Sequence, residues 1–301
     1  MNWFFIALIA PIFHAIANHI DKHIISSYFK GVSVGALVIF SSIFALIILP
    51  IIYIINPSVF SISSVIIYAL VLNGALGLGY VIFYLYALFD EEASIVAPFF
   101  QLIPVFGFIL GYLFLGEILT SKQGLAAAAI VIGAFILSLD IKNSLKPKLK
   151  LIYLMFSSSL LFALNNVIFK YFAIDTGFSI SLFWTMVGQV VLGIFLYIFI
   201  KSYRVSFKEV VRENSKKVLG LNMLNGFIIL IGDLASFYAL LFAPVALVFA
   251  VSGFQPLFVF IFGLVITLFF PHFGKESLEK SVLLQKIIGI LIIIGGSIYL
   301  N

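Results

Sequence analysis

The stretch ANHIDKH, residues 17–23, brings polar and charged side chains to the end of a first segment that is otherwise apolar. A reduced form of the same pattern, NNVIFK, returns at residues 165–170, about half the chain later. Asn18 and Lys22 align with Asn166 and Lys170, and in each pair the spacing of four puts both side chains on one side of a helix. A pattern that recurs at this distance indicates an internal repeat.

The chain has 301 residues, of which 63% are hydrophobic and 10% are charged. A soluble domain carries about 25% charged residues. Here, uncharged windows of about 20 residues recur, the length needed to cross the hydrocarbon core of a bilayer. The composition therefore predicts an all-α membrane protein surrounded by lipid, and the net charge of +5 is read as membrane orientation, with no nucleic-acid partner expected. Because the sequence has no cysteine, disulfides and thiol chemistry are excluded.

Charges, prolines and polar clusters interrupt the apolar sequence and predict ten transmembrane helices. The predicted spans cover residues 3–20, 33–55, 63–89, 93–115, 122–140, 150–172, 178–200, 218–242, 245–270 and 282–300. Longer connections are expected at 140–150, 201–217 and 271–281. All 17 Lys and Arg residues except Lys122 and Lys170 fall in or beside odd-numbered connections. The positive-inside rule therefore puts these connections in the cytoplasm and both termini outside.

Further short matches occur in the same order in the two halves. They pair LNG at 72–74 with 224–226, YAL at 86–88 with 238–240, QLIP ending at Pro104 with GFQP ending at Pro256, and IGA at 132–134 with IGG at 294–296. They predict two five-helix repeats, residues 1–145 and 146–301. Because five is odd, the second repeat must be inverted relative to the first. Many secondary transporters follow this plan and bind substrate between the repeats near the membrane midplane.

A more specific likeness lies in residues 84–137, YLYALFDEEASIVAPFFQLIPVFGFILGYLFLGEILTSKQGLAAAAIVIGAFIL. Its features are Ala-Leu at the end of span three, Pro104-Val105 in span four, Leu115-Gly116-Glu117 before Leu119-Thr120, and Gln123 with Ile132-Gly133-Ala134 in span five. In these features the chain resembles the EamA-type repeat of the drug/metabolite transporter superfamily. The Asn…Lys endings of spans one and six also fit. In the second half, PHFGKESLEKS replaces Leu-Gly-Glu.

The resemblance implies a fold of ten helices and the export or import of small metabolites. For many members of the family it also implies cytoplasmic termini. This orientation is opposite to the one derived from the charges of this sequence, so the two expectations conflict.

An aspartate and a histidine lie well inside predicted spans, away from the span ends. Asp233 lies deep within span eight, and an intramembrane carboxylate usually faces a cavity or a partner, so it is a candidate proton carrier. His14 lies in the middle part of span one, and histidine changes its charge near neutral pH. The structural alternatives are a hydrogen bond from a neighbouring Ser or Tyr to Asp233, and from His14 to a carbonyl. The predicted span limits separate the two residues by roughly 10 Å in depth, so a relay is expected between them and not direct contact.

Neutral polar residues recur symmetrically. Gln101 and Gln255 precede prolines in spans four and nine, and a proline frees a backbone carbonyl within a helix. Each glutamine is therefore a candidate for half of a substrate site between the repeats, with helix-to-helix hydrogen bonding as the alternative. Tyr84 and Tyr238 are candidates to line an aromatic cavity, although interface belts also attract tyrosine.

The Asn18/Lys22 and Asn166/Lys170 pairs are candidates for a gate or a substrate guide near each membrane face. The alternative is that both lysines snorkel to the interface. Glu117, together with Thr120, predicts a hairpin turn followed by a helix start.

These features favour a secondary transporter in the cytoplasmic membrane. It would move a small metabolite or drug-like molecule by proton coupling or exchange, as a monomer or homodimer. The sequence has no Gly-x-x-x-x-Gly-Lys-Ser/Thr loop for ATP, and no metal or other cofactor is expected. An intramembrane enzyme, which needs grouped catalytic side chains, is disfavoured because the cluster His19, Asp21 and His23 does not share a helix face. A lipid flippase, or a membrane sensor or scaffold, on the same fold is the alternative.

Overall fold

The computed structural model describes residues 3–28, 34–90, 96–138, 149–213, 215–269 and 280–300, and all regular secondary structure in these ranges is helical. The helices are α1 (Trp3–Tyr28), α2 (Val34–Ile55), η1 (Pro57–Phe60), α3 (Ser64–Asp90), η2 (Ala97–Gln101), α5 (Leu102–Leu115), α6 (Ser121–Ser138), α7 (Leu149–Thr176), α8 (Phe178–Phe199), α9 (Lys201–Glu213), α10 (Ser215–Leu240), α11 (Val245–Ser252), α12 (Gln255–Phe269) and α13 (Lys280–Leu300).

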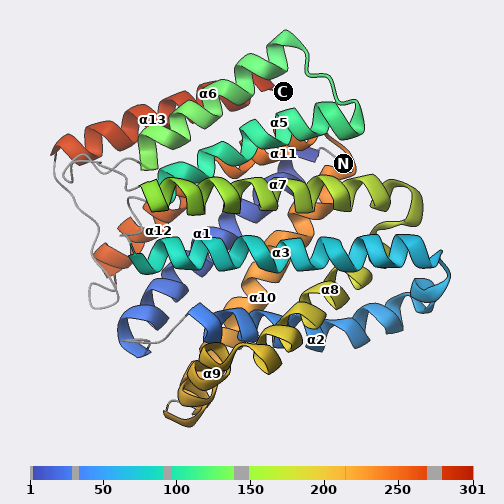
Figure 1. Ribbon diagram of the computed structural model, residues 1–301. Helices are drawn as coiled ribbons and strands as arrows, with labels where there is room; N and C mark the ends of the chain where they lie inside the picture. The colour runs from blue at the N-terminus through green and yellow to red at the C-terminus, as the bar shows by residue number, and fades with distance from the viewer. Residues whose placement is uncertain are drawn as a thin grey trace.

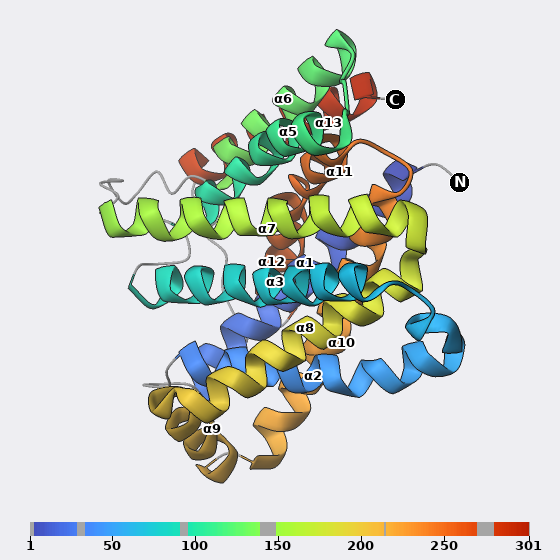
Figure 2. The same ribbon diagram turned by 45° about the vertical axis from the view of Figure 1, so that its right-hand side comes forward.

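The long helices lie side by side and run between two edges of the molecule (Figure 1). The connections α2–α3, α5–α6, α7–α8 and α10–α11 meet at one edge, on the right of Figure 1, together with the start of α1 and the end of α13. We call this the even edge, because it gathers the even-numbered connections. Helix α9 lies at the opposite edge, which we call the odd edge, and the turned view in Figure 2 shows the same division.

Within the described residues, eight helical segments are long and apolar enough to cross a membrane. Two shorter apolar helices, Phe99–Leu115 and Ser121–Leu137, coincide with the predicted spans four and five. Every predicted span thus has a helix. The chain is a multi-pass membrane protein with eight full-length candidate spans, and the count of ten stays a prediction.

Two expectations about helix limits are wrong. The polar stretch 17–23 does not end the first helix, because α1 continues to Tyr28. The segment 201–217, expected to be a connection, forms the amphipathic helix α9 and the start of α10. Its many charged residues concealed a helical arrangement of Tyr203, Phe207 and Val210, which all pack inward.

Spans four and nine are both interrupted near their glutamines. In span four, the 3-10 helix η2 ends at Gln101, where α5 takes over. In span nine, α11 ends at Ser252, and a tight turn at Gly253–Phe254 precedes α12, which starts at Gln255. A helix that breaks inside the membrane needs nearby partners for its freed backbone groups. These two breaks therefore mark the part of each half that is most suited to a polar site.

Glycines set how closely the helices approach. A side chain at Gly133 of α6 would meet the Gly289 carbonyl and the Ile293 side chain of α13 at 2.8 Å. Equally close approaches join α3 to α8, where Gly74 and Gly188 lie against each other's backbones. Because helices in lipid associate through van der Waals packing, contacts between small residues are a principal source of their stability.

We expect Gly133→Ala to lower the melting temperature of the purified protein in detergent. The added methyl group has to push α13 away, and overpacking of this kind costs about 1–3 kcal/mol. Gly124→Ala on the same helix is the matched control, because nothing lies within 4 Å of that position. Equal melting temperatures for the two variants would show that the α6–α13 contact does not limit stability.

Candidate functional site

A direct contact between two ionisable side chains joins the two halves of the chain. The imidazole Nε2 of His14, on α1, lies 3.0 Å from the carboxylate Oδ1 of Asp233, on α10. The two side chains are 24% and 38% exposed, so they are accessible from the space around them. The structure thus brings together the aspartate and the histidine that the sequence placed well inside predicted spans.

The direct contact of His14 with Asp233 corrects the expectation that the two residues lie at different depths and need a relay between them. The estimate assumed that α1 ends near residue 20, whereas α1 and α10 are both 26 residues long and pack along each other. Gly232 supplies the local reason for the contact. A side chain at Gly232 would lie 2.7 Å from His14 Nε2, so the bare glycine leaves room for the imidazole beside Asp233.

An aromatic residue of a third helix lies near this pair. Tyr80 of α3 is close enough to Asp233 and Tyr84 to interact with them electrostatically. The ring of Tyr80 packs edge-on against Phe162 of α7, with centroids 4.9 Å apart. Tyr80 therefore brings α3 near the His14–Asp233 pair, which itself joins α1 to α10.

An open apolar groove lies beside the pair, toward the even edge. It has a volume of about 500 Å³ and is lined by Phe5, Ile6, Ile9, Phe178, Leu234, Ala235 and Tyr238. Its residues come from α1, α8 and α10, and Leu234 directly follows Asp233 in the sequence. The predicted cavity residue Tyr238 is part of this groove, where it packs against Phe178 and Phe242.

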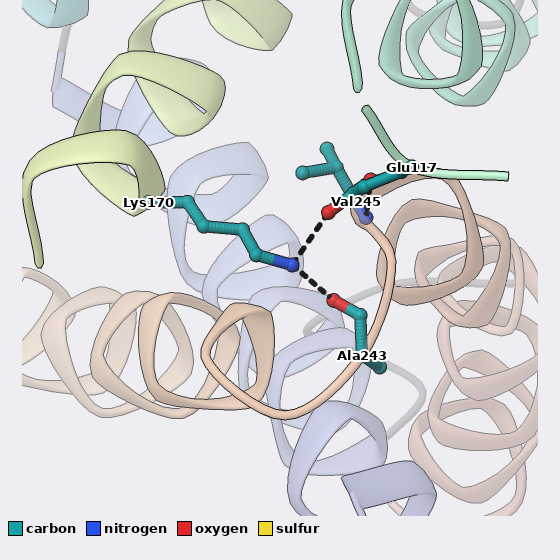
Figure 3. A network of polar contacts seen from close by, with 4 residues as sticks. All are labelled: Glu117, Lys170, Ala243 and Val245. Carbon is teal, nitrogen blue, oxygen red and sulfur yellow. Dashed lines mark hydrogen bonds and ion pairs between the residues drawn. The ribbon is translucent and has the colours of Figure 1, made fainter. Parts of the chain in front are cut away.

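An ion pair is located at the even edge, and it is buried. Lys170 Nζ of α7 donates to Glu117 Oε1 at 2.6 Å and to the Ala243 carbonyl at 2.7 Å. The other carboxylate oxygen of Glu117 accepts the Val245 backbone N–H at 2.8 Å. Figure 3 shows these contacts converging between α7 and the α5–α6 and α10–α11 connections. We call Lys170, Glu117, Ala243 and Val245 the even-edge latch.

The local sequence presents Glu117 in this position. Helix α5 ends at Leu115 and is followed by Gly116, whose φ of 64° is the left-handed conformation that favours glycine. The Glu117 N–H returns to the Gly111 carbonyl, and Gly111 has no side chain to displace the carboxylate. Helix α6 then starts with a capping box, in which Thr120 and Gln123 exchange side-chain to backbone hydrogen bonds. The predicted hairpin turn and helix start are both present.

Lys170 does not snorkel to the surface in this structure. Its side chain is 9% exposed and that of Glu117 is 12% exposed. From the sequence, Lys170 was a candidate for a gate or a substrate guide, whereas Glu117 was expected only to form a turn. A usable signal was present, because Glu117 and Lys170 are opposite charges at the ends of predicted spans four and six, which meet at the same edge.

The other predicted site residues are more dispersed. Asn166 is buried, and its side-chain amide donates to the Phe162 carbonyl of its own helix. Asn18 is exposed, and the side chain of Lys22 lies outside the described part of the chain. The structure therefore shows the second Asn…Lys pattern in detail and leaves the first as a prediction.

Gln101 and Gln255 are both partly exposed and stand at the two helix breaks. Tyr84 packs its ring against Phe100 in the same region, with centroids 5.2 Å apart. Trp184, by contrast, donates to the Val59 carbonyl at 2.7 Å and packs against Phe60, next to the α2–α3 connection. That position is typical of an interface residue.

A comparison with known protein families finds a match in the first half of the chain. Residues 1–139 match the EamA-like transporter family. This family belongs to the drug/metabolite transporter superfamily, so the resemblance drawn from residues 84–137 is confirmed. Members of this family are membrane transporters rather than enzymes.

No curated protein matches the chain. Among solved structures, 26 chains match it. One of them, described only as the crystal structure of a protein, is 14% identical with a TM-score of 0.56, and the match covers 97% of each chain. At this identity the likeness establishes a shared fold, and it does so over nearly the whole of both chains.

We expect Lys170→Met to destabilise the protein by about 3–5 kcal/mol, because it leaves the Glu117 carboxylate buried without its counter-charge. The double variant Lys170→Met/Glu117→Gln should recover much of this loss, since the glutamine amide still accepts the Val245 N–H. Unfolding by detergent titration measures both effects. Lys122→Met, at an exposed position, is the control. Additive losses in the double variant would show that the two charges are not coupled.

Proposed function

We propose that the protein is a secondary active transporter that moves a small metabolite or drug-like molecule across the cytoplasmic membrane by alternating access, driven by proton coupling or by exchange. The observation that carries the proposal is the His14–Asp233 pair, which joins one predicted repeat to the other at partly exposed positions. It is supported by the match of the first half to a transporter family.

The His14–Asp233 pair has the chemistry for coupling. With the carboxylate ionised and the imidazole protonated, the pair is neutral and the His14 N–H donates to Asp233. Loss of one proton leaves a neutral imidazole beside the carboxylate, so the pair becomes singly negative. A substrate that prefers one of these charge states exchanges against a proton or moves with it, and this linkage is reciprocal.

We further propose ten spans arranged as inverted repeats, residues 1–145 and 146–301. In this assignment α1 corresponds to α7, α3 to α10, and α5 to α11–α12. The packing supports it, because α1 packs against α10 and α11–α12, while α7 packs in the same way against α3 and α5. Helices α6 and α13, which correspond to each other, pack together closely.

The two halves differ in one helix contact, and this difference fits a transporter that is open to one side of the membrane. Helix α3 packs extensively against α8, whereas its counterpart α10 meets α2 in a short contact near Phe44 and Gly226. Two halves of like fold that adopt unlike packing are expected when the molecule is open to one side, and exchanging the two packings opens the other side.

The even-edge latch fits the role of a closed gate in this cycle. Glu117 belongs to the first repeat, whereas Lys170, Ala243 and Val245 belong to the second. Rocking of the repeats that opened the even edge would have to separate these groups. By the charge distribution, this edge faces the outside and the odd edge faces the cytoplasm.

A lipid flippase is the second candidate, and the apolar groove favours it. The groove is lined by Phe5, Ile9 and Tyr238 among others, and it gives an acyl chain a path along α1 and α10 toward the His14–Asp233 pair. The proposed mechanism of access is the same, and the two candidates differ only in what is carried.

We expect Asp233→Asn to abolish proton-coupled flux in proteoliposomes that are given a pH step and a panel of metabolites and drugs. The amide cannot take up or release the proton of the pair. Asp175→Asn is the matched control, since this carboxylate is exposed at the end of α7. Normal coupling in Asp233→Asn would make Asp233 structural. Movement of labelled lipid, without movement of any panel compound, would support the flippase.

A milder variant tests the geometry of the pair without removing either ionisable group. Gly232→Ala should weaken coupling, because its methyl group lies 2.7 Å from His14 Nε2 and displaces the ring. Gly220→Ala on the same helix is the control, as nothing lies within 4 Å of it. Wild-type coupling in Gly232→Ala would show that the His14–Asp233 contact is not required.

We expect the even edge to have two separations during transport. The chain has no native cysteine, so introduced cysteines are the only labelling sites. Spin labels at Ile118→Cys and Phe242→Cys, both exposed positions beside the latch, measure the distance across the even edge. Lys170→Gln should shift the distance distribution toward the longer separation, because it removes the charge that holds the edge closed. A single unchanged distance in wild type and variant, across pH and substrate conditions, would exclude the latch as a gate.

A further inference from the structure

Helix α9 presents two different faces. Its inner face is already docked, since Tyr203 and Val210 are buried and Phe207 packs against Phe40 of α2, with centroids 5.0 Å apart. The Tyr203 hydroxyl lies 3.0 Å from that of Tyr86 on α3, and Gly35 of α2 leaves room for the Tyr203 ring. The helix is thus held firmly against the odd-edge ends of α2 and α3.

The outer face of α9 carries a stripe of positive charge. Lys201, Lys208 and Arg212 are all exposed, and at 100° per residue they lie within a narrow sector opposite Tyr203 and Val210. The stripe extends about 16 Å along the helix, at 1.5 Å per residue. Arg204 is not part of this stripe, because its guanidinium donates to the Ile198 carbonyl at the end of α8.

The position of α9 determines what the stripe faces. It follows α8 after the single residue Ile200 and leads into α10, and both neighbours are candidate membrane spans. Figures 1 and 2 show α9 at the margin of the molecule, beside the start of α2, and not over the middle of the bundle. The exposed residues Val205, Val211 and Glu209 flank the stripe, so the outer face keeps a net positive charge with one carboxylate at its margin. A helix with a cationic outer face and exposed valines at the end of two spans suits the headgroup layer of a membrane.

We propose that the outer face of α9 binds the anionic headgroups of phospholipids at the odd edge. A phosphodiester headgroup is the complementary partner, because it brings negative charge to the depth at which the span ends and allows the valines to contact acyl chains. Basic residues near an anionic membrane surface each contribute to attraction in this way. This proposal is independent of which molecule the protein transports.

The test compares association of spin-labelled phosphatidylglycerol and phosphatidylcholine with the full-length protein in vesicles. We expect wild type to prefer phosphatidylglycerol, and Lys208→Gln and Lys201→Gln each to lower the preference by about fivefold. Lys208→Arg should retain it. High salt should reduce it in wild type, since exposed charges are screened. Lys122→Gln, which removes an exposed lysine at the even edge, is the matched control and should leave the preference unchanged.

Three results would overturn the proposal. The first is equal association of the two lipids with wild type, and the second is an equal loss in Lys122→Gln and Lys208→Gln. The third is displacement of the labelled lipid by millimolar inorganic phosphate, which would mean that α9 binds a free anion and not a membrane surface. Melting temperatures of all the variants, measured in parallel, separate lost lipid contacts from lost folding.

Discussion

The buried salt bridge between Lys170 and Glu117 is the interaction on which the arrangement of the even edge depends. Two charges with so little exposure persist in a membrane protein only when every group around them is satisfied. Here the amine has a carboxylate and a carbonyl, and the carboxylate also accepts the first N–H of α11. One pair of side chains therefore neutralises its own charges, caps a helix and joins α7 to two connections that are far apart in sequence.

The His14–Asp233 pair, to which we assign proton coupling, lies in a more open setting than the even-edge latch. Its side chains are 24% and 38% exposed, whereas those of Lys170 and Glu117 are 9% and 12% exposed. The two pairs differ in residue type and in exposure. These differences support assigning coupling to His14–Asp233, between α1 and α10, and closure to Lys170–Glu117 at the even edge.

The sequence was most informative where the bilayer imposes strict rules. Apolar length predicted a helix for every span, and Leu-Gly-Glu with Thr120 predicted the turn after α5. It failed at α9, because a short amphipathic helix with many charges is hard to distinguish from a charged loop when its apolar positions are few. It also failed to place His14 beside Asp233. Their contact depends on helix length and on the bare Gly232, neither of which follows from the depth of a residue within a predicted span.

Helix α10 links the two pairs physically. It carries Asp233 in its second half, and its end runs through a tight turn, with Leu241 and Phe242 bonded back to Tyr238 and Ala239, directly into the latch residue Ala243. Because these hydrogen bonds tie the turn to the end of α10, we expect a shift of α10 to reach Ala243. In the proposed cycle, a change of charge at His14–Asp233 alters the attraction between α1 and α10, and any resulting shift of α10 moves the carbonyl that Lys170 holds. Coupling and gating would then be two ends of one rigid element, which is the kind of shared two-state connection that energetic coupling between sites requires.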